Sequence, residues 1–196
     1  MRLAVFASTK GTDLQAVIDA IAGGSLVGVR LEFVLSNKRK CFALERARMA
    51  GIKTYFVSAK KADGEKKARG EYDAECLDLC KKHQIDLVFL IGYMRLLSQP
   101  FVEAYSGRIL NVHPSLLPDF PGMDIDVHRA VLDAGRLVTG CTVHLVDVGM
   151  DTGPIVLQRE VAVASDDTPE TLKEKVQAEE KIAVVEAIQL FRDKVS

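Results

Sequence analysis

The chain has 196 residues, of which 48% are hydrophobic and 27% are charged. This composition is typical of a folded globular protein and excludes an intrinsically disordered one. Lys and Arg total 26 against 27 Asp and Glu, so the formal net charge of -1 lacks the basic excess of a general nucleic-acid binder. The longest apolar run, Leu87 to Met94, is much shorter than the roughly 18 residues of a membrane-spanning helix, and the run from Leu3 to Ala7 is too short for a signal peptide. We therefore expect a cytoplasmic protein with neither nucleic-acid nor membrane partners.

The first 110 residues alternate between two periodicities. Short runs rich in Val, Ile, Leu and Phe predict strands at 3–7, 31–35, 54–57, 87–91 and 109–112. Apolar residues at helical spacing predict helices between them: Leu14, Val17, Ile18 and Ile21; Leu44, Ala47 and Ala50; and Tyr72, Cys76, Leu79 and Cys80. Such alternation indicates parallel strands joined by right-handed crossovers. The fold class expected is α/β, a Rossmann-like open, mostly parallel twisted sheet with helices on both faces.

The second half of the chain has a different character. Three prolines in residues 113–122 exclude a helix interior or a central strand, so this segment is expected to be a shaped loop. A helix at 126–134 and strands at 139–146 and 155–163 should follow. Thr168 and Pro169 predict the start of a final helix. Its buried face is expected to comprise Val176, Ile182, Val185, Ile188 and Leu190.

Two further features bear on organisation. The cysteines form no CxxC pair, so we expect reduced, mostly buried thiols at Cys41, Cys76, Cys80 and Cys141. The Lys-rich segment 60–69 is interpreted as a mobile surface loop. No linker interrupts the chain, and a single domain spanning 1–196 is expected.

Ligands of open α/β sheets bind beyond the carboxyl ends of the strands. After the first strand, residues 8–14 place small residues and a hydroxyl at the start of a helix, where an anion is favoured. Neither GxGxxG nor GxxxxGK[ST] occurs in the chain, which excludes the common nucleotide fingerprints. A merely structural strand-to-helix turn explains the local pattern equally well.

A second candidate site follows the strand at 109–112. Alternation places Asn111 and His113 on one side of that strand, and an amide beside an imidazole is suited to stabilising an oxyanion. Asp147 and Asp151 flank residues 148–150, and Gly153-Pro154 forces a turn after Asp151. A carboxylate presented from such a turn could orient an imidazole and raise its pKa. A structural histidine and a solvent-facing aspartate remain open as alternatives.

Other chemistries are disfavoured. His113, His128 and His144 lack a close metal-binding spacing such as HExxH, so no metal is expected. The helical spacing of Cys76, Cys80 and His83 favours a core-facing stripe. Ser115 is not part of a GxSxG motif, which argues against a serine hydrolase.

The sequence resembles the folate-dependent formyltransferases, and in particular the branch that acts in purine synthesis. The resemblance is carried by Asn111 to Pro118, by Pro121-Gly122 and by Asp151 to Ile155. It extends over nearly the whole chain through residues 36–38, 44–48, 92–98, 107–110 and 139–144.

The resemblance implies transfer of a formyl group from 10-formyltetrahydrofolate, a co-substrate, to the amine of a phosphorylated ribosyl glycinamide. It assigns oxyanion stabilisation to Asn111 and His113, and orientation of His113 and proton transfer to Asp151. It implies acceptor contacts by Gly11, Thr12, Asp13, Arg69 and Glu180, and a folate pocket lined by Met94, Arg95, Leu97, Val146, Asp147 and Val148. The acceptor half would be about 1–110, and the catalytic and folate-binding half about 111–196. A homodimer is left open.

The sequence departs from the family pattern in three places. Thr9, Lys10 and Asp13 replace the usual Gly-rich loop and its Asn, which puts a carboxylate near the expected phosphate. The loop 123–127 is about two residues longer than usual by comparison with the family pattern. Lys181 and Val184 stand where His and Tyr are common.

These departures leave alternative functions open. The chain could transfer the formyl group to a different amine, hydrolyse formyl folate, or bind a folate or nucleotide without catalysis. A methionyl-tRNA formyltransferase would carry an extra C-terminal domain, and a formyl-folate hydrolase an extra N-terminal one, so both would need a longer chain.

Overall fold

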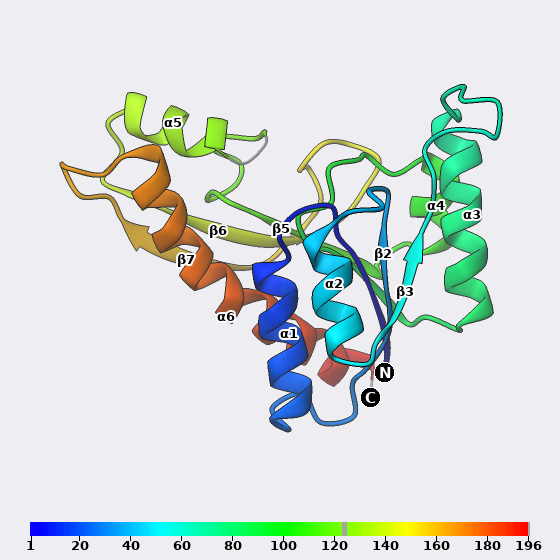
Figure 1. Ribbon diagram of the computed structural model, residues 1–196. Coiled ribbons are helices and arrows are strands. Elements are labelled where there is room, and N and C mark those ends of the chain that lie inside the picture. Colours follow the sequence, from blue (N-terminus) through cyan, green and yellow to red (C-terminus); the bar gives the residue numbers. More distant parts are fainter. Residues whose placement is uncertain (123–124, 196) are drawn as a thin grey trace. The chain divides into compact units, whose positions relative to one another are not determined.

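The computed structural model describes residues 1–122 and 125–195. Strands and helices alternate through the first half, and a strand pair and a long helix end the second (Figure 1). The strands are β1 (Arg2–Phe6), β2 (Arg30–Ser36), β3 (Lys53–Phe56), β4 (Leu87–Leu90), β5 (Ile109–His113), β6 (Val138–Leu145) and β7 (Ile155–Ala162). The helices are α1 (Thr12–Ala22), α2 (Phe42–Met49), α3 (Arg69–Lys82), α4 (Gln99–Ala104), α5 (Ile125–Asp133) and α6 (Pro169–Val195).

The strands form one seven-stranded sheet in the order β3-β2-β1-β4-β5-β6-β7. β1 pairs in parallel with β2 and with β4, and β2 pairs in parallel with β3. β6 and β7 pair antiparallel. The predicted α/β fold with a mostly parallel sheet is confirmed, and each predicted strand is present with its ends shifted by a residue or so.

The chain divides into two compact units, unit 1 (Met1–Leu110) and unit 2 (Asn111–Ser196). In unit 1 the strand order reverses at β1, because β2 and β3 lie to one side of it and β4 to the other. Right-handed crossovers then place α1 and α2 on one face and α3 on the opposite face. Figure 1 shows this arrangement, with α1 and α2 on one side of β2 and β3 and α3 on the other. The loops after β1 and β4 therefore meet at the point where ligands bind in such sheets.

Unit 2 is built around the β6–β7 pair and α6. Helix α6 packs on both strands and on α5. Its start matches the expectation, because the hydroxyl of Thr168 accepts a hydrogen bond from the N–H of Thr171 at 3.2 Å and Pro169 is the first helical residue.

The predicted buried face of α6 is partly wrong. Val176 and Ile188 are fully buried, whereas Ile182 and Leu190 are exposed. The residues that are buried along the helix are Leu172, Val176, Glu180, Ala183, Val184, Ala187 and Ile188. The buried face thus includes two small residues, Ala183 and Ala187, beside the larger Val176 and Ile188, whereas the prediction counted only large aliphatic side chains.

Two elements of unit 1 were missed or misplaced. The short helix α4, with Pro100 in its first turn, was not predicted. Within the segment 60–69, the N–H of Lys61 donates to the carbonyl of Glu65 at 2.7 Å and that of Lys67 to Ala59 at 2.9 Å, so these residues form a hairpin-like turn. Arg69 is not part of that loop, because it begins α3.

The cysteines are all free and buried, as expected. Burial raises the pKa of the Cys76 and Cys141 thiols to about 12. No helix in the described residues is long and apolar enough to cross a membrane.

The turn that precedes α1 depends on a glycine. Gly11 has φ 69°, and a Cβ atom there would lie 2.8 Å from the Cβ of Ala43. Left-handed φ and close approach both require glycine at this position. The tight contact fixes the first turn of α1 against the start of α2.

We predict that Gly11→Ala lowers the free energy of unfolding by about 2 to 4 kcal/mol, combining left-handed strain with overpacking. Gly24 is the matched control, since its φ is 78° but nothing lies within 4 Å of an added Cβ. Gly24→Ala should cost only about 1 kcal/mol. Urea unfolding of both variants measures the difference; equal losses would show that Ala43 yields without cost.

Candidate active site

Polar side chains from two strands and one loop of unit 2 gather around a single carboxylate. β5 supplies Asn111 and His113, which alternation places on the same side of the strand. β6 supplies His144 near its end, and the loop after β6 supplies Asp151. Oδ2 of Asp151 lies 3.5 Å from Nδ1 of His113, and Oδ1 lies 3.6 Å from Nε2 of His144.

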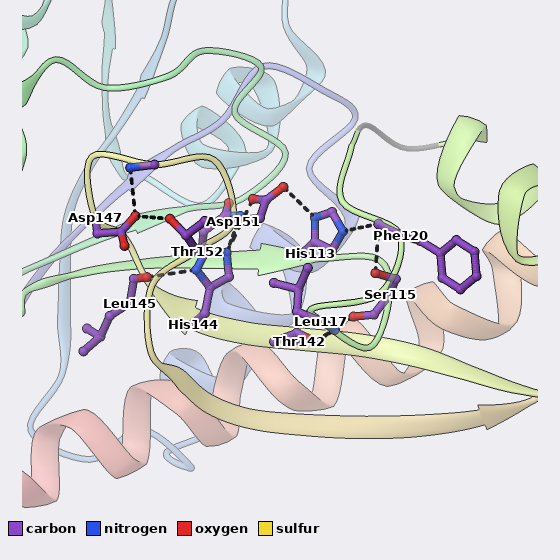
Figure 2. Close-up of polar contacts among 12 residues, drawn as sticks. His113, Ser115, Leu117, Phe120, Thr142, His144, Leu145, Asp147, Asp151 and Thr152 are labelled. Carbon is purple, nitrogen blue, oxygen red and sulfur yellow. Dashed lines mark hydrogen bonds and ion pairs between the residues drawn. The ribbon is translucent and has the colours of Figure 1, made fainter.

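His113 is almost fully buried, and its two ring nitrogens face different partners (Figure 2). Nε2 lies 3.0 Å from the carbonyl oxygen of Phe120. A carbonyl can only accept, so Nε2 carries a proton. In the neutral ring Nδ1 is then an unprotonated acceptor that faces the acceptor oxygen of Asp151. No hydrogen therefore lies between Nδ1 and the carboxylate in this state, and an added proton would be shared by the two groups.

His144 has the opposite arrangement of protons. Its Nδ1 donates to the carbonyl of Leu145 at 2.9 Å, which leaves Nε2 as the acceptor in the neutral ring. Nδ2 of Asn111 lies 3.1 Å from that Nε2 and donates to it. This contact orients the Asn111 amide, which retains a second N–H for another acceptor.

Burial and charge set the protonation states at this site. Burial is the main cause that lowers the pKa of His113, and it outweighs the opposing effects of the Phe120 carbonyl and the Asp151 charge. Burial by itself would raise the pKa of Asp151, but hydrogen bonding with His144, which requires the imidazolium form of that ring, and the proximity of His113 lower it below its ordinary value. At neutral pH the pair is therefore a neutral imidazole beside a carboxylate.

The proline-containing loop after β5 is held by buried hydroxyl groups. Ser115 donates to the carbonyls of Asp119 and Phe120, at 2.8 and 3.1 Å. Thr142 of β6 donates to the carbonyl of Ser115 at 2.6 Å and accepts from the N–H of Leu117 at 3.0 Å. These bonds fix the Phe120 carbonyl, and through it the ring of His113.

The loop that carries Asp151 is closed by its own side chains. Oδ1 of Asp147 accepts from the N–H of Gly149 at 2.9 Å and from the hydroxyl of Thr152 at 2.7 Å. Asp151 itself has φ 55°. A Cβ at Gly153 would lie 1.8 Å from the carbonyl oxygen of Leu145, so only glycine fits there. The role observed for Asp147 is thus to shape the loop, in which Val146 is half-buried and Val148 is exposed.

In unit 1 the loop after β1 is held in place by α2. The carbonyl of Thr9 accepts from the N–H of Ala43 at 3.3 Å and from the thiol of Cys41 at 3.1 Å. Arg46 donates to the carbonyl of Lys10 at 2.9 Å. Gly11 and Asp13 are buried and Thr12 is half-buried, all at the start of α1.

The remaining predicted residues lie on several elements. Met94, Arg95 and Leu97 lie in the loop after β4, with Met94 exposed and Leu97 buried. Arg69 is exposed at the start of α3, and Glu180 is buried on α6. Of the loop expected at 123–127, residues 123–124 lie outside the described part of the chain, and residues 125–127 are not a loop because they form the first turn of α5.

Sequence reasoning missed the roles of His144, Thr142 and the Phe120 carbonyl. His144 was considered only as a metal ligand, yet Thr142 and His144 alternate toward one side of β6, which is a signal of the kind that singled out β5. No signal marks a main-chain carbonyl as a partner. In the part of the chain that the structure describes, no group of three or more His, Cys, Asp or Glu side chains could hold a metal ion.

The geometry predicts how His113 titrates. Its pKa lies below 6.5 because burial disfavours the imidazolium, and the Asp151 charge acts in the opposite direction. Asp151→Asn removes that charge, so the titration midpoint of the His113 ring protons should move to still lower pH. NMR titration of the wild type and the variant measures this.

His83 provides an internal control for this titration. Its pKa is lowered by burial and by Lys53, with no contribution from Asp151. Its midpoint should therefore be the same in both proteins. A rise in the His113 midpoint on Asp151→Asn would show that the Asp151 charge does not stabilise the imidazolium.

Comparison with known proteins shows which family the chain belongs to. The profile of the formyl transferase family matches residues 1–188. The phosphoribosylglycinamide formyltransferase of Escherichia coli is 39% identical over 193 residues, which cover 98% of this chain and 88% of that protein. The trifunctional purine biosynthetic protein adenosine-3 of Drosophila pseudoobscura pseudoobscura is 44% identical over 192 residues, 97% of this chain. The chain spans only 14% of the length of that insect protein.

Solved structures agree with this comparison. The glycinamide ribonucleotide transformylase 1 of Symbiobacterium toebii superposes with a TM-score of 0.92 at 40% identity, over 99% of this chain and 88% of that one. The phosphoribosylglycinamide formyltransferase of Bacillus halodurans gives a TM-score of 0.91 at 36% identity, over 100% and 97% of the two chains. The protein described here therefore belongs to the formyl transferase family.

Proposed function

We propose that this protein is a phosphoribosylglycinamide formyltransferase, which transfers the formyl group of 10-formyltetrahydrofolate to the amine of glycinamide ribonucleotide in purine biosynthesis. The observation that carries the proposal is the neutral imidazole of His113 facing the carboxylate of Asp151, a pair that can take up one proton. The choice of glycinamide ribonucleotide as the acceptor rests on the names of the relatives.

The proposed reaction develops charge at two atoms, the formyl oxygen and the attacking nitrogen. The amine nitrogen attacks the formyl carbon, and the carbonyl oxygen becomes an oxyanion as the new C–N bond forms. The amide of Asn111 keeps one N–H on His144 and has a second that can donate to this oxyanion. His113 would stabilise the same intermediate once it carries a proton.

The proton balance follows from the same pair. The attacking amine loses a proton, which Nδ1 of His113 can accept while Asp151 stabilises the imidazolium that results. When the bond between the formyl carbon and the folate nitrogen breaks, that nitrogen takes up a proton. The pair then returns to its starting state, and no net proton is gained or lost.

The residues that we propose for folate binding come from two loops. Met94, Arg95 and Leu97 come from the loop after β4, and Val146, Asp147 and Val148 from the loop after β6. Met94 and Val148 expose apolar side chains, 37% and 71% accessible, of a kind that can cover an aromatic ring. Oδ1 of Asp147 is engaged inside its loop, and we expect the loop's main-chain groups to contact the polar edge of the ring as well.

The acceptor phosphate would lie at Gly11, Thr12 and Asp13. The first turn of α1 presents main-chain N–H groups, which favour an anion. Arg69 and Glu180 would contact the rest of the acceptor. Asp13 adds a carboxylate where a dianion is expected, and Lys10 in the same loop supplies a compensating charge.

The carboxylate of Asp13 also favours an alternative. A formyl transfer to a less anionic amine, or hydrolysis of the formyl folate, would avoid repulsion between Asp13 and a phosphate. The catalytic pair is the same in these reactions, so only the acceptor distinguishes them.

An assay with 10-formyltetrahydrofolate, with and without glycinamide ribonucleotide, tests the proposal. We expect tetrahydrofolate to be released only when the ribonucleotide is present. Release at the same rate without it would identify a hydrolase. Binding of the folate with no turnover would exclude this acceptor.

We further predict that Asp151→Asn lowers kcat by about 10² to 10⁴, the range typical of lost proton-transfer catalysis. KM for the folate should change by less than about threefold, because the predicted folate contacts do not include Asp151. Asp133→Asn, an exposed carboxylate on α5, is the matched control. Equal losses in kcat and in folate affinity would mean that Asp151 only holds its loop.

A further inference from the structure

A buried carboxylate lies beneath the loop 92–98, which carries the expected folate contacts of unit 1. Asp73 belongs to α3 and is 1% exposed. Its Oδ2 accepts a hydrogen bond from the main-chain N–H of Ser98, at the end of that loop. One side chain of α3 thus fixes the position of the main chain where the loop enters α4.

The rest of the loop is attached to neighbouring parts of unit 1. The hydroxyl of Tyr93 donates to the hydroxyl of Tyr72 at 2.9 Å, and the guanidinium of Arg95 lies 4.1 Å from the centre of the Tyr72 ring. The carbonyl of Gly92 accepts from the N–H of Ser8 at 3.0 Å. Between these contacts lie Met94, which is exposed, Arg95, which is half-buried, and Leu97, which is buried.

Burying Asp73 is costly for the fold. Among the described residues its Oδ1 has no hydrogen-bond partner, and neither has the buried Nε of Arg95. Burial raises the pKa of Asp73, against the opposing effect of the Ser98 hydrogen bonds and of Arg95 and Arg69. A half-satisfied buried carboxylate is not what stability alone would favour, since an apolar side chain often serves as well.

We propose that Asp73 is a positioning residue for folate binding: by accepting the N–H of Ser98 it holds the loop 92–98 in the conformation that receives the co-substrate. The inference rests on the proposed function. A preformed loop avoids the entropic cost of ordering its main chain when the ligand binds, so the benefit of Asp73 is expressed in folate affinity.

Asp73→Ala removes the acceptor and should raise KM for 10-formyltetrahydrofolate about tenfold, as expected for one hydrogen bond to a charged group. The kcat and the KM for glycinamide ribonucleotide should stay within about twofold. The amide of Ser98 should exchange its hydrogen faster. Asp78→Ala, an exposed carboxylate of the same helix, is the matched control.

Two further variants keep the test decisive. Ser98→Pro removes the donor from the loop side, and its φ of -77° is one that proline adopts; it should raise the folate KM as Asp73→Ala does, even where the alanine variant fails to fold. Asp73→Asn keeps an acceptor oxygen for Ser98 and should restore folate KM to within about threefold of the wild type.

The outcomes are separable. A folate KM unchanged in Ser98→Pro, or a loss in Asp73→Asn as large as in Asp73→Ala, would overturn the proposal. If the wild type shows no transfer to glycinamide ribonucleotide, the proposed function fails, but calorimetric binding of tetrahydrofolate and exchange of the Ser98 amide still decide the role of Asp73.

Discussion

The site depends on one buried imidazole whose two nitrogens face different partners. A main-chain carbonyl, that of Phe120, holds the proton of one nitrogen of His113, so the other nitrogen must face Asp151 as an acceptor. Burial lowers the pKa of His113, and His144 and His113 lower the pKa of Asp151, most strongly when either ring carries a proton. The pair can therefore accept one proton. The proposed reaction needs such an acceptor, because a neutral amine loses a proton when it becomes an amide.

The loops around this pair are held by contacts within unit 2. Hydroxyl groups of Ser115 and Thr142 fix the turn that presents the Phe120 carbonyl. Asp147 closes the next loop by accepting from two of its neighbours, and Gly153 lets that loop pass against the carbonyl of Leu145. Preorganisation of this kind lowers the reorganisation needed when charge develops in a reaction.

In unit 1, too, loops at the ends of strands are held by hydrogen bonds and packing contacts. Its strand order reverses at β1, which brings the loop after β1 beside the loop after β4. The first is held by Cys41 and Arg46, and the second by Tyr72 and Asp73. In both, a helix packed on the sheet supplies the groups that fix a loop. Buried polar groups are retained where a loop must keep one shape.

The sequence by itself determined the sheet, its class and the residues at strand ends, because periodicity reports which faces are buried and alternation reports which side chains share a side. Asn111 and His113 could be paired in this way. Only the tertiary structure decided that His144 orients Asn111, that a carbonyl fixes His113, and that alanines of α6 are buried where Ile182 is exposed. These depend on distances between segments remote in sequence and on main-chain groups, which every residue carries alike and no sequence pattern marks.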